Sequence, residues 1–357
     1  MRDEDTLIRR ITRALPSQIG RVRNHYGVAF GIGDDAAILH SPRGEEWIIS
    51  CDAFIEGVHF LPDIHPADSV GYKALVRATS DLVAMGASPK LFLLTLALPE
   101  RRCGHWMDQF LIGMRRAAKY LDVRLAGGDT TTGATVSISI AVLGQMEGQR
   151  SRRARISAKG GRRQIGGALK RSGGRAGDQI YVSGALGRAQ VGLEFVRCMK
   201  KQIERPRVGS SLDAALQPHL YPRLRVELGK WLARNHVASA MMDLSDGLSS
   251  DLARLCRASG VGAKLWADRI PVVSLPAKML RRLPRSLDPL RGALNGGDDY
   301  ELLFTVPRRN EQRLHSAPDS HELTCVGELT SGSQILLVNA DGRMKPLKIG
   351  GWDPFRK

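Results

Sequence analysis

Hydrophobic positions follow two different periods along the chain, and each period predicts one kind of element. Leu7, Ile8 and Ile11 recur at helical spacing, whereas Ile138 and Ile140 alternate with serines as in a half-buried strand. We expect helices at 4–15, 69–85, 106–120, 187–201, 223–235 and 248–258. We expect strands at 36–39, 47–52, 90–98, 123–126, 136–144, 179–183, 238–243, 264–267, 300–306, 323–329 and 334–338. Because strands and helices alternate in both halves, the fold class is α/β or α+β with two layers.

The length of the chain favours more than one domain. It has 357 residues, which is long for a single hydrophobic core. The apolar pattern stops in a stretch rich in glycine and arginine, and this stretch is typical of a linker or an insertion. We expect an N-terminal domain at 1–148, a connector at 149–176 and a C-terminal domain at 177–357.

Four clusters of glycine and aspartate lie beside these apolar runs. They occupy residues 31–35, 127–129, 243–247 and 296–299. Taken singly, each cluster has a plain explanation as a turn or a helix cap, with Asp34 in a turn and Asp246 near an N-cap. Taken together, they predict loops at strand ends that bring several carboxylates to one place. Such a place suits Mg²⁺, which prefers oxygen ligands and usually binds phosphates as well.

Neither common nucleotide-binding fingerprint is present in the sequence. There is no G-x-x-x-x-G-K-[ST] segment, and no G-x-G-x-x-G follows a predicted strand and opens a helix. If the chain binds ATP, metal ions held by carboxylates must therefore neutralise the phosphates.

Composition excludes several other classes of protein. The five cysteines are scattered without a C-x-x-C pair, which fits neither a disulfide framework nor a zinc site. No apolar run is long enough to cross a bilayer and the first residues are charged, so we expect no membrane partner and a cytoplasmic location. The net charge is +17, but ten of the positive residues fall within 150–175, where there is no acid. This tract is typical of a solvated loop, and nucleic-acid binding through it is the weaker alternative.

Several segments together resemble the thiamine-monophosphate kinases, a family within the ATP-binding superfamily of aminoimidazole-ribonucleotide synthetase. The segments are GIGDDAAIL (31–39), SCDAFIEGVHF (50–60), YKALVRATSDLVAMGA (72–87), AGGDTT (126–131), RSGGRAGDQIYVSGALG (171–187), MDLSDGLSSDL (242–252) and NGGDDYELLFTVP (295–307). They span nearly the whole chain. The resemblance implies a two-domain PurM-like fold, in which the N-terminal sheet pairs with its copy in a homodimer and the C-terminal domain is a layered α/β domain.

The resemblance also implies an activity. It is the direct, Mg²⁺-dependent transfer of the γ-phosphoryl group of ATP to thiamine monophosphate, which gives thiamine diphosphate and ADP. The acceptor phosphate is already charged and needs no strong general base, so the main difficulty is to bring two anions together.

Roles for individual residues follow from their positions in the family's motifs. The implied metal ligands are Asp35, Ser50, Cys51, Asp52, Asp81, Asp129, Asp243 and Asp246, and among them Asp52, Asp81 and Asp129 are the expected catalytic residues. The implied ATP-binding residues are Tyr120, Gly128, Asp129, Arg171 and Ser245. The implied substrate-binding residues are His59, Asp298 and Trp352. The family usually has Thr where Cys51 stands and Glu where Asp298 stands.

Two superfamily relatives remain as alternative enzymes. A hydrogenase-maturation protein should end in cysteine, whereas this sequence ends Phe355-Arg356-Lys357. A selenophosphate synthetase should carry a reactive cysteine and a lysine near its N-terminus, and residues 1–30 contain neither.

Overall fold

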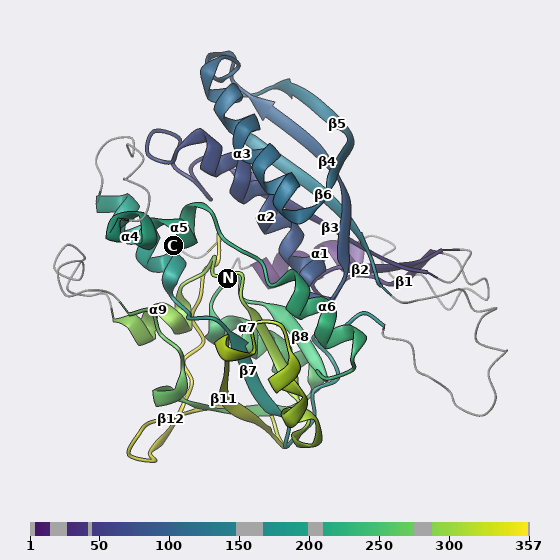
Figure 1. Cartoon of the computed structure of the whole chain (residues 1–357), viewed down its shortest axis with the longest axis vertical. Coiled ribbons are helices and arrows are strands. Elements are labelled where there is room, and N and C mark those ends of the chain that lie inside the picture. Colours follow the sequence, from purple (N-terminus) through teal and green to yellow (C-terminus); the bar gives the residue numbers. More distant parts are fainter. Residues whose placement is uncertain are drawn as a thin grey trace.

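The structure is a computed structural model, and it describes residues 4–14, 27–41, 45–147, 167–198, 210–274 and 288–355. Most of the basic tract at 150–175 lies outside these residues, as does the end of the helix expected at 187–201. The described residues form two β-sheets with helices packed against them (Figure 1). Among them, no helix has both the length and the apolar character that crossing a bilayer requires. All five cysteines are free thiols.

The N-terminal half contains a six-stranded sheet in the order β1-β2-β3-β6-β4-β5. The β4–β5 pair is parallel and the other neighbours are antiparallel. The strands are β1 (Gly27–Phe30), β2 (Ala37–His40), β3 (Glu46–Ile55), β4 (Ser88–Leu98), β5 (Arg124–Thr132) and β6 (Ser137–Gln145), and the helices of this half are α1 (Glu4–Ala14), α2 (Ala67–Ala84) and α3 (His105–Leu121).

Helices α2 and α3 cover one face of this sheet and pack tightly against each other (Figure 1). Glycines permit this approach. A Cβ atom at Gly113 would lie 1.7 Å from the backbone oxygen of Asp68, and one at Gly71 would lie 2.0 Å from that of Phe110. Helix α2 is buried on nearly all sides because it lies between this sheet and the C-terminal half. The polar side chains of α2 are therefore held at the junction of the two halves.

The opposite face of the N-terminal sheet has no helix over it among the described residues (Figure 1). Strand β6 alternates strictly between buried and half-buried positions, as a sheet with one covered face requires. The edge strand β5 is exposed along its whole length. Leu93 on β4 follows the buried Phe92 and remains 40% exposed, so this side of the sheet presents apolar surface to solvent.

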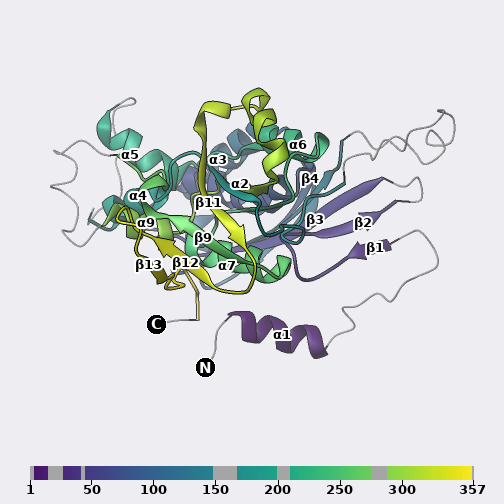
Figure 2. The same cartoon turned by 90° about the horizontal axis from the view of Figure 1, so that it is seen from below.

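The C-terminal half contains a seven-stranded sheet in the order β13-β12-β9-β11-β7-β10-β8. Its strands are β7 (Gln179–Ser183), β8 (Ala240–Asp243), β9 (Gly262–Trp266), β10 (Leu302–Val306), β11 (Leu323–Thr330), β12 (Ile335–Val338) and β13 (Met344–Pro346). The helices of this half are α4 (Arg188–Cys198), α5 (Ser211–Leu220), α6 (Val226–Arg234), α7 (Leu248–Ser259) and α9 (Pro289–Asn295). One hydrophobic cluster runs from the N-terminal sheet through α2 to Met241 and Phe304, so the two halves share a core. Figure 2 shows α1 on the outside of the molecule, beyond α7.

Several predicted elements differ from those observed. Residues 127–129 were expected in a loop after a short strand, but they lie inside β5, which continues to Thr132. Asp52 lies in the middle of β3 and not at its end. Helices α5 and α9 had no counterpart in the sequence pattern, because α5 contains Pro218 and α9 has only seven residues. The strand predicted at 300–306 begins two residues later, at Leu302. Tyr300 cannot be part of it because its φ of 50° is not extended.

Candidate active site

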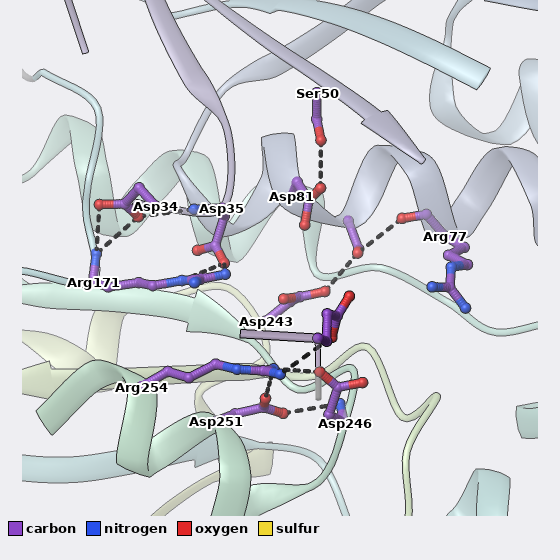
Figure 3. A network of polar contacts seen from close by, with 12 residues as sticks. Asp34, Asp35, Ser50, Arg77, Asp81, Arg171, Asp243, Asp246, Asp251 and Arg254 are labelled. Atoms are coloured by element: carbon purple, nitrogen blue, oxygen red, sulfur yellow. Dashed lines mark hydrogen bonds and ion pairs between the residues drawn. The ribbon is translucent and has the colours of Figure 1, made fainter. Parts of the chain in front are cut away.

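Three carboxylates from distant parts of the chain converge between the two halves. Asp35 follows β1 in a loop, Asp81 lies on α2, and Asp243 ends β8. Each offers an oxygen, and these oxygens lie within 4.8 Å of one another. Figure 3 shows the three side chains pointing toward one another. We call Asp35, Asp81 and Asp243 the carboxylate cluster.

Asp35 is a fully buried member of the cluster. Its side chain is 0% exposed, and Arg171 binds its Oδ1 atom through Nε at 2.9 Å. Its Oδ2 atom is buried without any hydrogen-bond partner among the described residues. Burial, with help from neighbouring carboxylates, raises the pKa of Asp35 to about 7 even though Arg171 opposes the shift. A buried carboxylate oxygen with no partner, beside two further carboxylates, is a donor set that fits a hard divalent cation.

Asp81 and Asp243 are each held by a serine hydroxyl. Ser50 Oγ donates to Asp81 at 2.5 Å, and Ser80 Oγ donates to Asp243 at 2.6 Å. Burial raises the pKa of both carboxyls, and nearby carboxylates raise that of Asp81 further. Within the described residues, no arginine or lysine forms an ion pair with Asp81. The cluster therefore carries negative charge that the protein itself does not balance.

Asp34 holds the loop and does not join the cluster. Its carboxylate accepts the backbone N–H of Arg171 at 3.0 Å and that of Asp35 at 3.0 Å. These bonds fasten the C-terminal part of the connector to the loop after β1. They place the Arg171 guanidinium, a predicted ATP-binding group, directly against Asp35.

The three predicted metal ligands on β3 do not all point to the same face of the strand, because successive side chains alternate between its two faces. Ser50 faces Asp81. Asp52 accepts a hydrogen bond at 2.6 Å from Nε of Arg77 on α2. Cys51 points to the opposite face, where its Sγ atom lies 3.5 Å from Ser139 Oγ. The side chain of Cys51 is therefore directed away from the cluster.

Asp246 lies in a second acidic group beside α7. Arg254 bridges Asp246 and Asp251, at 3.0 Å from Asp251 Oδ1. The other oxygen of Asp251 accepts the N–H groups of Asp246 and Gly247 at 3.1 Å each. The N-cap of α7 is Gly247, next to Asp246 as the sequence predicts, and Asp251 in the first turn of the helix ties the preceding backbone to it.

Three predicted nucleotide-binding residues lie away from the cluster. Asp129 and Gly128 are exposed on β5, and the Asp129 carboxylate accepts a local hydrogen bond from the backbone N–H of Thr130 at 2.9 Å. Gly128 is required by packing, since a Cβ there would lie 1.8 Å from the backbone oxygen of Leu94. The Tyr120 hydroxyl donates to the carbonyl of Leu224 at 3.0 Å, beside a separate pocket of about 670 Å³.

A pocket of about 410 Å³ adjoins the cluster and gathers the three predicted substrate residues, His59, Asp298 and Trp352. The ring centroids of His59 and Trp352 are 5.3 Å apart. Burial lowers the pKa of His59 to about 4, so this imidazole is neutral near neutral pH. Ser245 and Asp246 line the same pocket. The pocket therefore has an aromatic part, at His59 and Trp352, and a polar part, at Ser245 and Asp246. We call it the substrate pocket.

Asp298 reaches the substrate pocket as one partner of a buried ion pair. Lys73 Nζ lies 2.8 Å from Asp298 Oδ2, and the side chain of Lys73 is only 3% exposed. The Tyr300 hydroxyl donates to the other carboxylate oxygen at 2.7 Å. Lys73 also lies 3.3 Å from His219, which in turn contacts His65 at 3.1 Å. Lys73 depresses the pKa of Asp298 although burial opposes the shift, so this carboxylate stays ionised.

The sequence reasoning missed Lys73, Arg77, Ser80, Asp251 and Arg254. The first three had a readable signal: together with Asp81 they recur three or four residues apart on a helix, and so share one face. Asp251 and Arg254 follow the same spacing on α7. The partners of Lys73 and Ser80 lie far away in the sequence, and no local pattern identifies them.

Comparisons with known proteins agree with this geometry. Residues 33–146 match the family model "AIR synthase related protein, N-terminal domain", and residues 175–338 match the corresponding C-terminal domain. The chain is 38% identical to a thiamine-monophosphate kinase of Salmonella typhimurium over 340 residues, which cover 94% of this chain and 95% of the relative.

Solved structures show the same likeness. The crystal structure of thiamine-monophosphate kinase from Stenotrophomonas maltophilia K279a is 34% identical, with a TM-score of 0.69 over 95% of this chain and 97% of that one. The structure of AaThiL complexed with AMPPCP and TMP is 29% identical, with a TM-score of 0.79 over 99% of both chains.

Proposed function

This chain belongs to the thiamine-monophosphate kinase family, and we propose that it transfers the γ-phosphoryl group of ATP directly to thiamine monophosphate. The products are thiamine diphosphate and ADP. Family membership confirms the resemblance read from the motifs and the mixed α/β fold in two domains. It does not favour selenophosphate synthetase, a hydrogenase-maturation protein or a nucleic-acid-binding protein as alternatives.

The observation that carries the metal part of the proposal is the carboxylate cluster with its unpartnered Asp35 oxygen. Asp35, Asp81 and Asp243 would hold Mg²⁺, and Asp52 with Asp246 would extend the site toward the substrate pocket. When bound, Mg²⁺ supplies positive charge to the phosphate oxygens of ATP. The serines at positions 50 and 80 orient two of the carboxylates by donating hydrogen bonds.

The remaining chemistry needs positioning more than proton transfer. The acceptor is a phosphate oxygen that is already negative, so no side chain has to remove a proton from it. Arg171, fixed by Asp34 and Asp35, offers a guanidinium to the phosphates of ATP. Trp352 and His59 would take the aromatic part of thiamine in the substrate pocket, and Asp298 would bind its polar edge. The side chains thus hold two anions in line for transfer.

We also propose a homodimer joined through the open face of the N-terminal sheet. Leu93 supports it, because it leaves apolar surface on the open face of β4. Asp129 and Gly128 lie on the same edge strand. A molar mass of two chains by light scattering would agree with this proposal, and a mass of one chain would refute it.

The domains are proposed to be 1–148 and 177–357, joined by the connector 149–176. The reaction is proposed to take place in the cytoplasm, where ATP and Mg²⁺ are available.

The direct test is to incubate the purified protein with ATP, Mg²⁺ and thiamine monophosphate and to separate the thiamine esters by chromatography. We expect thiamine diphosphate and ADP in equal amounts. Consumption of ATP without thiamine diphosphate would refute the assignment. Asp52→Asn and Asp129→Asn should each abolish turnover while the far-UV circular dichroism spectrum stays unchanged.

A further inference from the structure

Arg77 lies where the substrate pocket meets the carboxylate cluster. It is on α2, one turn before Ser80 and Asp81, and it lines the substrate pocket. Its side chain is 20% exposed, and its Nε atom donates to Asp52 Oδ2 at 2.6 Å. Figure 3 draws Arg77 on the other side of the cluster from Arg171. The two guanidinium groups therefore approach the cluster from different directions.

The guanidinium of Arg77 keeps most of its donors available. An arginine has five N–H donors in a fixed fork, and Asp52 takes the one on Nε. Among the described residues, Asp52 is the only side chain that forms a hydrogen bond or ion pair with the guanidinium of Arg77. The two terminal nitrogens remain available to bind a ligand. The hydrogen bond from Nε to Asp52 fixes the orientation of the guanidinium plane.

The other charged groups of the substrate pocket are already paired. Asp298 is bound by Lys73, Asp246 by Arg254, and Arg197 by Glu194 at 3.0 Å. His59 and His65 are neutral near neutral pH, because burial lowers the pKa of each to about 4. Arg77 and Arg197 each use one N–H donor on a carboxylate among the described residues, but Arg197 is 57% exposed, whereas Arg77 is 20% exposed and lies one turn from Asp81. Its position predicts an anionic group near the cluster and an aromatic body toward Trp352.

We propose that Arg77 binds the phosphate of thiamine monophosphate through its two terminal nitrogens while its Nε atom stays on Asp52. This inference rests on the proposed function and adds a specificity-determining residue to it. A planar fork can bind two phosphate oxygens at once, which a lysine cannot do. Arg77 thereby selects phosphorylated thiamine over thiamine and offsets the repulsion between the acceptor phosphate and the carboxylate cluster.

The test compares Arg77→Met with Arg77→Lys and with a matched control, Arg102→Met. Arg102 resembles Arg77 in exposure, at 18%, and in having one carboxylate partner, Asp63 at 3.3 Å, but it does not line the substrate pocket. Steady-state kinetics give the KM for thiamine monophosphate and for ATP. Isothermal titration gives the Kd of thiamine and of thiamine monophosphate, each in the presence of Mg²⁺.

We expect the KM for thiamine monophosphate to rise about 10- to 100-fold in Arg77→Met, the loss expected when hydrogen bonds to a charged group are removed. The KM for ATP and the Kd for thiamine should change little. Arg77→Lys should be intermediate because it keeps the charge without the fork. Arg102→Met should match the wild type. If Arg77→Met does not fold by circular dichroism, the Arg77→Lys shift decides the question.

Two results would overturn the inference. One is an unchanged KM for thiamine monophosphate in both Arg77 variants. The other is an equal loss of affinity for thiamine and thiamine monophosphate, which would show that Arg77 only shapes the pocket. A wild-type protein that forms no thiamine diphosphate would instead overturn the proposed function, and this inference with it.

Discussion

Asp81→Asn removes one of the two charges of the carboxylate cluster that form no ion pair with an arginine or lysine among the described residues. The substitution keeps the size of the side chain, and the asparagine oxygen can still accept the hydrogen bond from Ser50. If the cluster exists to hold a divalent cation, the metal-free protein should become more stable. The variant should also lose most of its stabilisation by Mg²⁺.

The geometry of the cluster sets the size of this effect. Two full charges 4.8 Å apart repel by about 3.5 kcal/mol at an effective dielectric constant near 20. Arg171 offsets part of the charge on Asp35, and the raised pKa of Asp81 and Asp243 shows that both carboxyls are protonated more readily than usual. We therefore expect Asp81→Asn to stabilise the metal-free protein by about 1–3 kcal/mol, or a few degrees in Tm.

The assay is thermal unfolding of wild type and Asp81→Asn, each with EDTA and with excess Mg²⁺. Excess metal should stabilise the wild type by about 3 kcal/mol when its concentration is about a hundred times the Kd. The variant should gain much less, because one ligand of the three is lost. Ser139→Ala, on the opposite face of β3 and β6, is the control and should respond to Mg²⁺ as the wild type does.

Two outcomes would refute the reasoning. If Asp81→Asn is less stable than wild type in EDTA, then the cluster does not carry uncompensated repulsion. If Mg²⁺ raises the Tm of both proteins equally, then the metal binds elsewhere.

Three other predictions concern the substrate pocket and its support. Lys73→Met leaves Asp298 without its buried partner, so it should lower the free energy of unfolding by about 3 kcal/mol. The double variant Lys73→Met/Asp298→Asn should recover part of that loss, as measured by urea unfolding in a double-mutant cycle. Additive losses would contradict this prediction. His65 has a folded pKa of about 4 against an ordinary 6.5, so its contribution to stability is complete above pH 6.5 and is lost as the pH falls toward 4, by roughly 3 kcal/mol. The Tm of His65→Gln should fall less than that of wild type across this range, and parallel curves would exclude His65 as the cause. Trp352→Ala should raise the KM for thiamine monophosphate about tenfold without changing the KM for ATP, and an equal rise in both would place Trp352 outside the substrate pocket.

The sequence predicted most of the long elements because their hydrophobic periods are regular. Helices α2 and α3 and strands β4 and β6 have such periods and lie near the expected bounds. The exceptions have physical causes. Strand β5 contains two glycines that read as a turn, yet the close approach of β4 requires one of them. Helix α5 contains a proline that normally ends a helix.

The site was predictable in part for a similar reason. The Gly/Asp clusters marked Asp35 and Asp243, and the structure brings both together with Asp81. The pairings of Lys73 with Asp298 and of Arg77 with Asp52 could not be read, because each joins residues that are distant in sequence through the burial of α2. The orientation of Cys51 needed only strand alternation, once β3 was known to run through it.

The most direct test of the central claim follows the labelled γ-phosphoryl group. Wild-type protein is mixed with γ-³²P-ATP, thiamine monophosphate and Mg²⁺, quenched in acid and separated into thiamine esters, inorganic phosphate and protein. We predict that the label appears in thiamine diphosphate, that the protein stays unlabelled, and that EDTA stops the transfer. Label on the protein, or thiamine diphosphate formed at the same rate in EDTA, would contradict direct transfer at a metal-holding carboxylate cluster.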